Sequence, residues 1–142
     1  MARNVALIPA SAERIWQVLA DPDSYAHWVV GSDTIRDADP GWPQPGTRIH
    51  HRVGVGPLKI NDNTEVVEAA PPRHLALQAR ARPLGSARVV LDLAEEGAST
   101  RVVMVEEPGD RFSRTLHNPI TDRLVHHRNR ESLRRLAELA MA

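Results

Sequence analysis

The chain contains 142 residues, of which 42% are hydrophobic and 25% are charged. This composition is typical of a globular protein and excludes a disordered one. Eighteen basic and eighteen acidic residues give a formal net charge of zero, which excludes a general electrostatic attraction to nucleic acid or to an anionic membrane. The lack of cysteine excludes disulfides, zinc–thiolate sites and thiol nucleophiles.

The length fits one domain that spans residues 1–142. The first residues lack the cationic start and the apolar stretch of a signal peptide. No apolar run approaches the ~20 residues that a membrane span requires. We therefore expect a cytoplasmic protein that does not insert into membranes.

The first part of the chain predicts one strand and two short helices. Residues 3–9 predict a strand that ends at Pro9. Ser11 is a suitable N-cap for the helix that follows. The Asp21-Pro22 step ends this helix, and a second short helix is expected from residue 23 to about residue 28.

The middle of the chain alternates apolar and polar residues in short segments separated by turn sequences, including 41–47, 56–59 and 83–86. This pattern predicts an antiparallel meander, followed by a loop at 108–117. The expected strands cover residues 32–38, 48–55, 60–67, 74–82, 87–96 and 100–107.

The last part of the chain predicts one long helix from about residue 119 to residue 141. Asn118 suits its N-cap and Pro119 its first position. At 1.5 Å per residue, such a helix is about 34 Å long. Because one face of the sheet must be covered, and no other expected element is long enough, we expect this helix to cover it.

Three segments carry a resemblance to a known family: IPASAERIWQVLADPDSYAHW at the front, the series of strands, and NPITDRLVHHRNRESLRRLAELA at the end. With these segments the chain resembles the START-related helix-grip superfamily (SRPBCC), in its polyketide cyclase/dehydrase-like branch. The resemblance implies an α+β helix-grip fold. In that fold a seven-stranded antiparallel sheet wraps around the C-terminal helix, with a cavity between them and two short helices between the first two strands. Members bind lipids, sterols, polyketides or aromatic compounds, and some are cyclases or hydrolases.

The long helix is apolar in its second half and polar in its first half. We expect the second half to seal against the sheet and the first half to line a pocket, where Leu124 or Val125 lies beside His126 and Asn129. Packing these polar groups without partners would cost about 1–3 kcal/mol each, whereas a pocket holding water or a ligand avoids this cost. The alternative is that His126 and Asn129 point to solvent.

The opposite wall of the pocket is expected on the strands. If residues 56–59 form a tight turn, Val53 pairs with Asp62 and His51 with Thr64. His51 can then exchange a hydrogen bond with Thr64 across the strands or with Asp62 diagonally. The side chains expected on this face are Ile49, His51, Val53, Val55, Ile60, Asp62, Thr64 and Val66.

Glu106 completes a candidate catalytic set. If Met104 points inward, Glu106 also points into the cavity or its mouth. A buried His51 beside the carboxylate of Asp62 or Glu106 is a plausible acid/base pair for cyclisation or dehydration of a polyketone, and a pocket carboxylate with few partners would have a raised pKa. The alternative is a polar network that fixes the sheet or holds a ligand without reaction.

The expected pocket is mainly aliphatic, with Trp28 and Trp42 as candidates for a lid. The histidines lack the spacing of a metal site, so no metal and no cofactor are expected. The basic residues of the last helix come with no nucleic-acid motif, so no nucleic-acid partner is expected. The predicted ligand-binding residues are Trp28, Ile49, His51, Val53, Asp62, Thr64, Leu77, Met104, Glu106, Val125 and Asn129.

Three functions remain open from the sequence. The first is binding of a small hydrophobic molecule in the cavity, and the second is a polyketide cyclase or dehydratase that uses His51 with Asp62 or Glu106. The third is a co-chaperone or interaction domain without a functional cavity. The protein is expected to be a monomer or a homodimer.

Overall fold

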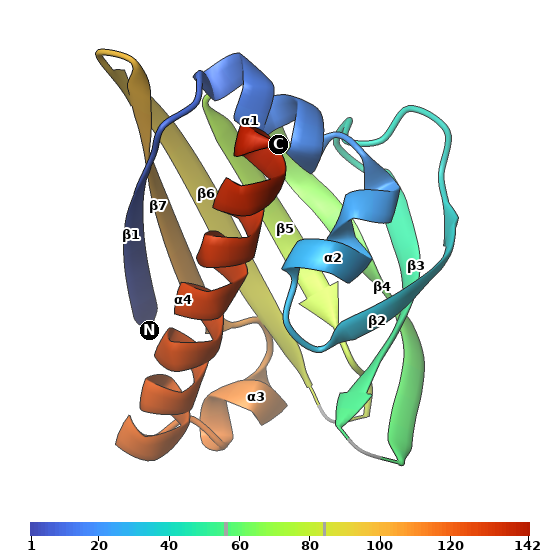
Figure 1. Cartoon of the computed structure of the whole chain (residues 1–142). Coiled ribbons are helices and arrows are strands. Elements are labelled where there is room, and N and C mark those ends of the chain that lie inside the picture. The colour runs from blue at the N-terminus through green and yellow to red at the C-terminus, as the bar shows by residue number, and fades with distance from the viewer. Residues whose placement is uncertain (56, 84) are drawn as a thin grey trace.

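The computed structural model describes residues 1–55, 57–83 and 85–142. Seven strands, four α-helices and one short 3₁₀ helix follow one another in these residues. Figure 1 shows how they are arranged. Their bounds are β1 Ala2–Ile8, α1 Ala12–Leu19, η1 Pro22–Ser24, α2 Tyr25–Trp28, β2 Ser32–Ala38, β3 Arg48–Val55, β4 Leu58–Ala70, β5 His74–Arg80, β6 Ser86–Glu96, β7 Ser99–Pro108, α3 Arg111–Thr115 and α4 Pro119–Met141.

The strands form one antiparallel sheet in the order β1-β7-β6-β5-β4-β3-β2. Strands β2 to β7 pair in chain order, and β1 joins the edge beside β7. The sheet curves, and α4 lies across its concave side, while α1 and α2 cover the same side near one end (Figure 1). This is the predicted α+β helix-grip fold, with two short helices between the first two strands.

Both predicted helix starts are confirmed. The Ser11 hydroxyl accepts a hydrogen bond from the Arg14 backbone N–H at 3.1 Å. The Asn118 side chain accepts from the backbone N–H groups of Ile120 and Thr121, and the Thr121 hydroxyl accepts in return from the Asn118 N–H. These bonds satisfy N–H groups that the first turn of a helix leaves without an intrahelical partner.

Most strand boundaries differ from the prediction by one or two residues, and two segments differ by more. Strand β4 starts at Leu58 and continues to Ala70, beyond the expected 60–67. The expected loop at 108–117 contains the short helix α3, whose first turn is capped by Asp110 through the Ser113 N–H at 2.7 Å. The turns expected at 56–59 and 83–86 each include one residue, 56 and 84, that lies outside the described residues.

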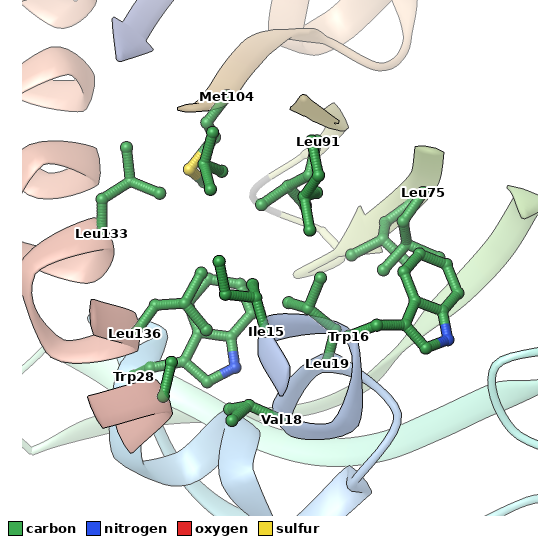
Figure 2. Close-up of a cluster of buried hydrophobic side chains, with 14 of the residues drawn as sticks. Ile15, Trp16, Val18, Leu19, Trp28, Leu75, Leu91, Met104, Leu133 and Leu136 are labelled. Atoms are coloured by element: carbon green, nitrogen blue, oxygen red, sulfur yellow. The ribbon is translucent and has the colours of Figure 1, made fainter. Parts of the chain in front are cut away.

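The core lies between the concave side of the sheet and the helices α1, α2 and α4. Figure 2 shows Met104, Leu91 and Leu75 of the sheet on one side of this cluster and Leu133 and Leu136 of α4 flanking it. Ile15, Leu19 and Trp28 fill the remaining side from α1 and α2, and all eight of these side chains are buried. The second half of α4 therefore seals against the sheet, as its apolar stripe predicts.

Candidate functional site

The pairing of β3 with β4 differs from the expected register by two residues. His51 lies opposite Asp62, Ile49 lies opposite Thr64, and Val53 lies opposite Ile60. The predicted pairs His51–Thr64 and Val53–Asp62 are therefore wrong. Because the shift is an even number of residues, each side chain still points to the predicted face of the sheet.

His51 is buried on the concave face, with 5% of its surface exposed. Its Nε2 atom lies 2.9 Å from the Thr64 hydroxyl, which confirms one of the two predicted hydrogen bonds. Its Nδ1 atom has no hydrogen-bond partner among the described residues. Burial lowers the pKa of His51 below its ordinary value, although the nearby Asp62 carboxylate opposes this shift. The imidazole is thus neutral at neutral pH.

Asp62 is held by Arg82 rather than by His51. Its carboxylate accepts from the Arg82 backbone N–H at 2.8 Å, from Nε at 3.0 Å and from Nη2 at 2.8 Å. Burial raises the pKa of Asp62, but these hydrogen bonds outweigh burial and bring the pKa to about 2. A raised pKa is expected for a pocket carboxylate with few partners, and Asp62 does not meet this condition because it has several. Asp62 is ionised and cannot donate a proton at neutral pH.

Glu106 points to the concave side with Met104, as predicted, but it is also paired. One nitrogen of Arg128 lies 2.6 Å from both of its carboxylate oxygens, and the Asn129 side chain donates to it at 3.1 Å. Strands β4, β5 and β6 separate Glu106 from His51, a path of about 19 Å along the sheet at the usual strand spacing. The structure thus brings His51 together with Thr64 and Asp62 but not with Glu106.

The polar first half of α4 faces two environments. Asn129 is 1% exposed and turns inward to Glu106. His126 is exposed, although its backbone carbonyl accepts a hydrogen bond from the Asn4 side chain at 2.9 Å. Of the two alternatives for these residues, the inward orientation holds for Asn129 and the solvent orientation holds for His126.

A pocket of about 190 Å³ lies between the ends of β6 and β7, the α3 segment and the first turns of α4. It is partly open, and its position agrees with the expected space between the sheet and the first half of the last helix. Glu106 and Val125, two of the predicted ligand-binding residues, line it. The other lining residues include Ala87, Pro108, Leu116 and Thr121.

Most of the remaining predicted ligand-binding residues belong to the packed core. Ile49, Leu77 and Met104 are buried, and Val53 is half-buried. Trp28 is 1% exposed, and its ring centroid lies 5.1 Å from that of Tyr25. These residues shape the inner face of the fold but are not among those that line the pocket.

The two tryptophans considered as a lid are both buried in the core. The Trp42 ring packs edge-on against the Tyr25 ring, with the two ring centroids 5.4 Å apart. Its Nε1 donates a hydrogen bond to the Leu19 carbonyl at 3.2 Å. The Trp28 Nε1 has no hydrogen-bond partner in the part of the chain that the structure describes. Neither tryptophan lines the pocket, whereas Ser113 of α3 and Leu116 after it do.

Sequence reasoning missed the arginines that hold the two inner carboxylates. Arg82 lies two residues after the end of β5 and reaches back to Asp62, twenty positions earlier in the chain. Arg128 is one of the basic residues of the last helix, and its side chain binds Glu106. A signal was present: an inward carboxylate on a strand requires a cation or several donors nearby, because an unpaired buried charge is very costly.

No group of three or more His, Cys, Asp or Glu side chains is arranged to hold a metal ion in residues 1–55, 57–83 and 85–142. No helix in these ranges is long and apolar enough to cross a membrane.

The family model described as "Polyketide cyclase / dehydrase and lipid transport" matches residues 2–140. The chain belongs to this family. The resemblance seen in the sequence is therefore confirmed, and the description of the family covers both the processing of polyketides and the transport of lipids. A search of curated proteins found no match.

Solved structures show the same fold over nearly the whole chain. A protein of Chromobacterium violaceum matches with a TM-score of 0.72 at 17% identity, over 99% of this chain and 96% of that one. A protein of Mycobacterium smegmatis matches with a TM-score of 0.71 at 20% identity, over 98% and 89%. A protein in the dynemicin biosynthetic locus matches with a TM-score of 0.63 at 17% identity, over 96% of this chain and 45% of that one.

Proposed function

We propose that this protein binds a small hydrophobic molecule, lipid-, polyketide- or terpenoid-like, in the pocket between the sheet and the first half of α4. The observation that carries the proposal is the position of the pocket, with Glu106 and Val125 in its wall. The family description supports the same class of ligand. A pocket of about 190 Å³ is smaller than the 300–1,000 Å³ typical of drug-sized ligands, so it accommodates a small molecule or one end of a longer one.

The wall of the pocket combines apolar contact with polar side chains. The polar residues that line it are Ser86, Glu106, Glu107, Ser113, His117, Thr121 and Asp122. Ala87, Leu116 and Val125 supply apolar surface, which drives binding by its removal from water. Glu106 is 11% exposed at its side chain and already accepts from Arg128 and Asn129. A ligand oxygen placed beside this group meets donors that are anchored in position, which suits an oxygenated hydrophobic molecule.

The test uses native mass spectrometry of freshly purified protein, together with a titration with the fluorescent probe 1-anilinonaphthalene-8-sulfonate. We expect Val125→Trp, which fills the pocket, to weaken probe binding at least about tenfold, as loss of one buried aliphatic contact and steric overlap would do. Leu124→Trp is the matched control, because Leu124 is the neighbouring residue, is 64% exposed and does not line the pocket. Equal probe binding by all three proteins would show that the pocket is not the binding site.

A second candidate function is a polyketide cyclase or dehydratase. The observation that favours it is His51, a buried, neutral imidazole hydrogen-bonded to Thr64, whose Nδ1 atom is free of hydrogen bonds to the described residues. Such a group can accept an α-proton from a ketone. It ranks second because Asp62 is ionised and Glu106 lies three strands away, so neither supplies the acid that a dehydration also requires.

The two functions are separated by turnover. A linear poly-β-ketone thioester is incubated with the protein and with His51→Gln, and cyclised products are followed over a range of pH. Turnover that rises as the imidazole loses its proton, and that His51→Gln abolishes, supports the enzyme. Absence of turnover in the presence of probe binding supports the binding protein. The third function, an interaction domain with no functional cavity, is less well supported because a pocket is present. The cytoplasmic location and the monomeric or dimeric state stay predictions from the sequence.

A further inference from the structure

Exposed apolar side chains gather at the end of the molecule where the pocket opens. Leu116, which follows α3, is 52% exposed, and Ile120 and Leu124 in the first turns of α4 are 73% and 64% exposed. Ile120 and Leu124 are four positions apart on the helix and therefore lie on one stripe. Large apolar residues that cluster on the surface mark interaction sites more often than scattered ones do.

Unpaired arginines surround this stripe. Arg111 and Arg114 lie on α3 and Arg123 lies on α4 between the two apolar positions, and all three are exposed. None of their side chains makes a hydrogen bond or an ion pair with another described residue. The one acidic residue in the first turn of α4, Asp122, is engaged by the N-terminal ammonium at 2.9 Å. Glu107, which lines the pocket, and Asp110, which directly precedes α3, offset part of this positive charge. The three arginines outnumber these two acidic residues, so this end is modestly cationic although the net charge of the chain is zero.

The same stripe is continuous with the pocket. Leu116 is exposed at the surface and also lines the pocket, together with Thr121 and Val125 on the adjoining face of α4. In Figure 1, α3 and the first turns of α4 lie at the same end of the molecule, opposite the end where α4 meets α1. A ligand that enters or leaves the pocket through this mouth would therefore pass beside the exposed apolar stripe.

We infer that this end of the protein, formed by Leu116, Ile120 and Leu124 with Arg111, Arg114 and Arg123, docks on an anionic lipid surface. Apolar side chains flanked by arginines are the combination that binds a membrane interface, with the arginines at the charged headgroups and the apolar groups below them. The docking is peripheral, which agrees with the lack of a membrane-spanning helix among the described residues. It goes beyond the proposed function, because it requires no ligand in the pocket.

The experiment is co-sedimentation of the full chain with vesicles of phosphatidylcholine alone and of phosphatidylcholine mixed equally with phosphatidylglycerol. We expect binding to the mixed vesicles and at least about tenfold weaker binding to the neutral ones, since each arginine near an anionic surface contributes roughly a fivefold factor. Raising the salt from about 0.1 M to about 1 M is expected to weaken binding to the mixed vesicles, because the Debye length falls from about 10 Å to about 3 Å.

Two variants and a matched control test the named residues. Leu124→Glu is expected to lower binding at least about tenfold by removing an inserted apolar group and adding a repelled charge, and Arg123→Gln to lower it roughly fivefold. Leu7→Glu is the control, because Leu7 is a 57% exposed apolar residue on β1, outside the stripe, and it is expected to leave binding within about twofold.

Three results would overturn the inference. The first is a wild-type protein that remains in the supernatant with mixed vesicles, and the second is a loss with Leu7→Glu equal to that with Leu124→Glu. The third is a dimer in sedimentation velocity that Leu124→Glu dissociates while vesicle binding is unchanged, which would identify the stripe as a self-interface. The Val125→Trp variant separates this inference from the proposed function, since it is expected to lose probe binding and keep vesicle binding.

Discussion

The pairing of Arg82 with Asp62 offers a quantitative test of how the inner face of the sheet is stabilised. The Asp62 side chain is 5% exposed and accepts from the backbone N–H of Asn63 and from three donors of Arg82. Its pKa falls from 3.8 to about 2, and a difference of one pH unit corresponds to about 1.4 kcal/mol. Ionised Asp62 therefore contributes about 2 kcal/mol to the free energy of unfolding at neutral pH.

Substitution of Arg82 by Ala removes two of these donors and leaves the backbone N–H in place. We expect the free energy of unfolding to fall by about 1–2 kcal/mol at neutral pH. Because the pKa is depressed in the folded protein, this stabilisation is present above the ordinary carboxyl pKa and is lost as the pH falls from about 4 to about 2. The difference between wild type and variant should therefore shrink over that range.

The assay is urea unfolding followed by tryptophan fluorescence, at neutral pH and near pH 3. Arg73→Ala is a matched control, since Arg73 is exposed and its side chain has no partner in the described parts of the chain; it should change stability by less than about 0.5 kcal/mol. A loss with Arg82→Ala that is equal at both pH values would refute the assignment of Asp62 as an ionised residue held by this arginine.

Three further predictions concern stability. Leu136→Ala, at a fully buried position, should lower the free energy of unfolding by about 2–5 kcal/mol in chemical denaturation. The pKa of His74 is raised, mainly by its hydrogen bond to Asp92. This pair therefore stabilises the fold below the ordinary histidine pKa, and the stabilisation is lost as the pH rises through the pKa of His74 in the folded protein. His74→Ala should lower the melting temperature more at pH about 5.5 than at pH about 8. Gly85 has a φ of +134° and a Cβ there would overlap the Ser113 hydroxyl, so Gly85→Ala should cost about 1–3 kcal/mol in the same denaturation assay.

The features that the sequence predicted well are those set by local chemistry. Ser11 and Asn118 identified both helix starts because a capping side chain acts within three residues of its own position. Alternation placed His51, Thr64 and Glu106 on the inner face because successive strand residues point to opposite sides. These patterns fixed the order of elements, and the family resemblance supplied the way in which the sheet and the last helix meet.

The features that were missed depend on groups far apart in the chain. Alternation cannot distinguish two registers that differ by two residues, so the β3–β4 pairing depended on an assumed turn length. Helix α3 is too short to be stable on its helix propensity alone. It is held in place by Asp110, which accepts hydrogen bonds from the Ser113 N–H and from the Ser86 hydroxyl of β6. The partner of Asp62 was missed for the same reason, since Arg82 approaches it through the β4–β5 hairpin.

The carboxylate of Glu106 in the pocket wall bears on what the pocket selects. It would repel an anionic ligand and would be costly to bury alone, but Arg128 and Asn129 already bind it. A ligand group that interacts with Glu106 would have to displace one of these internal partners. Glu107, His117 and Asp122 also line the pocket, beside the apolar surface of Ala87, Leu116 and Val125. A ligand in this pocket would therefore be selected by its polar groups as well as by its shape and apolar area.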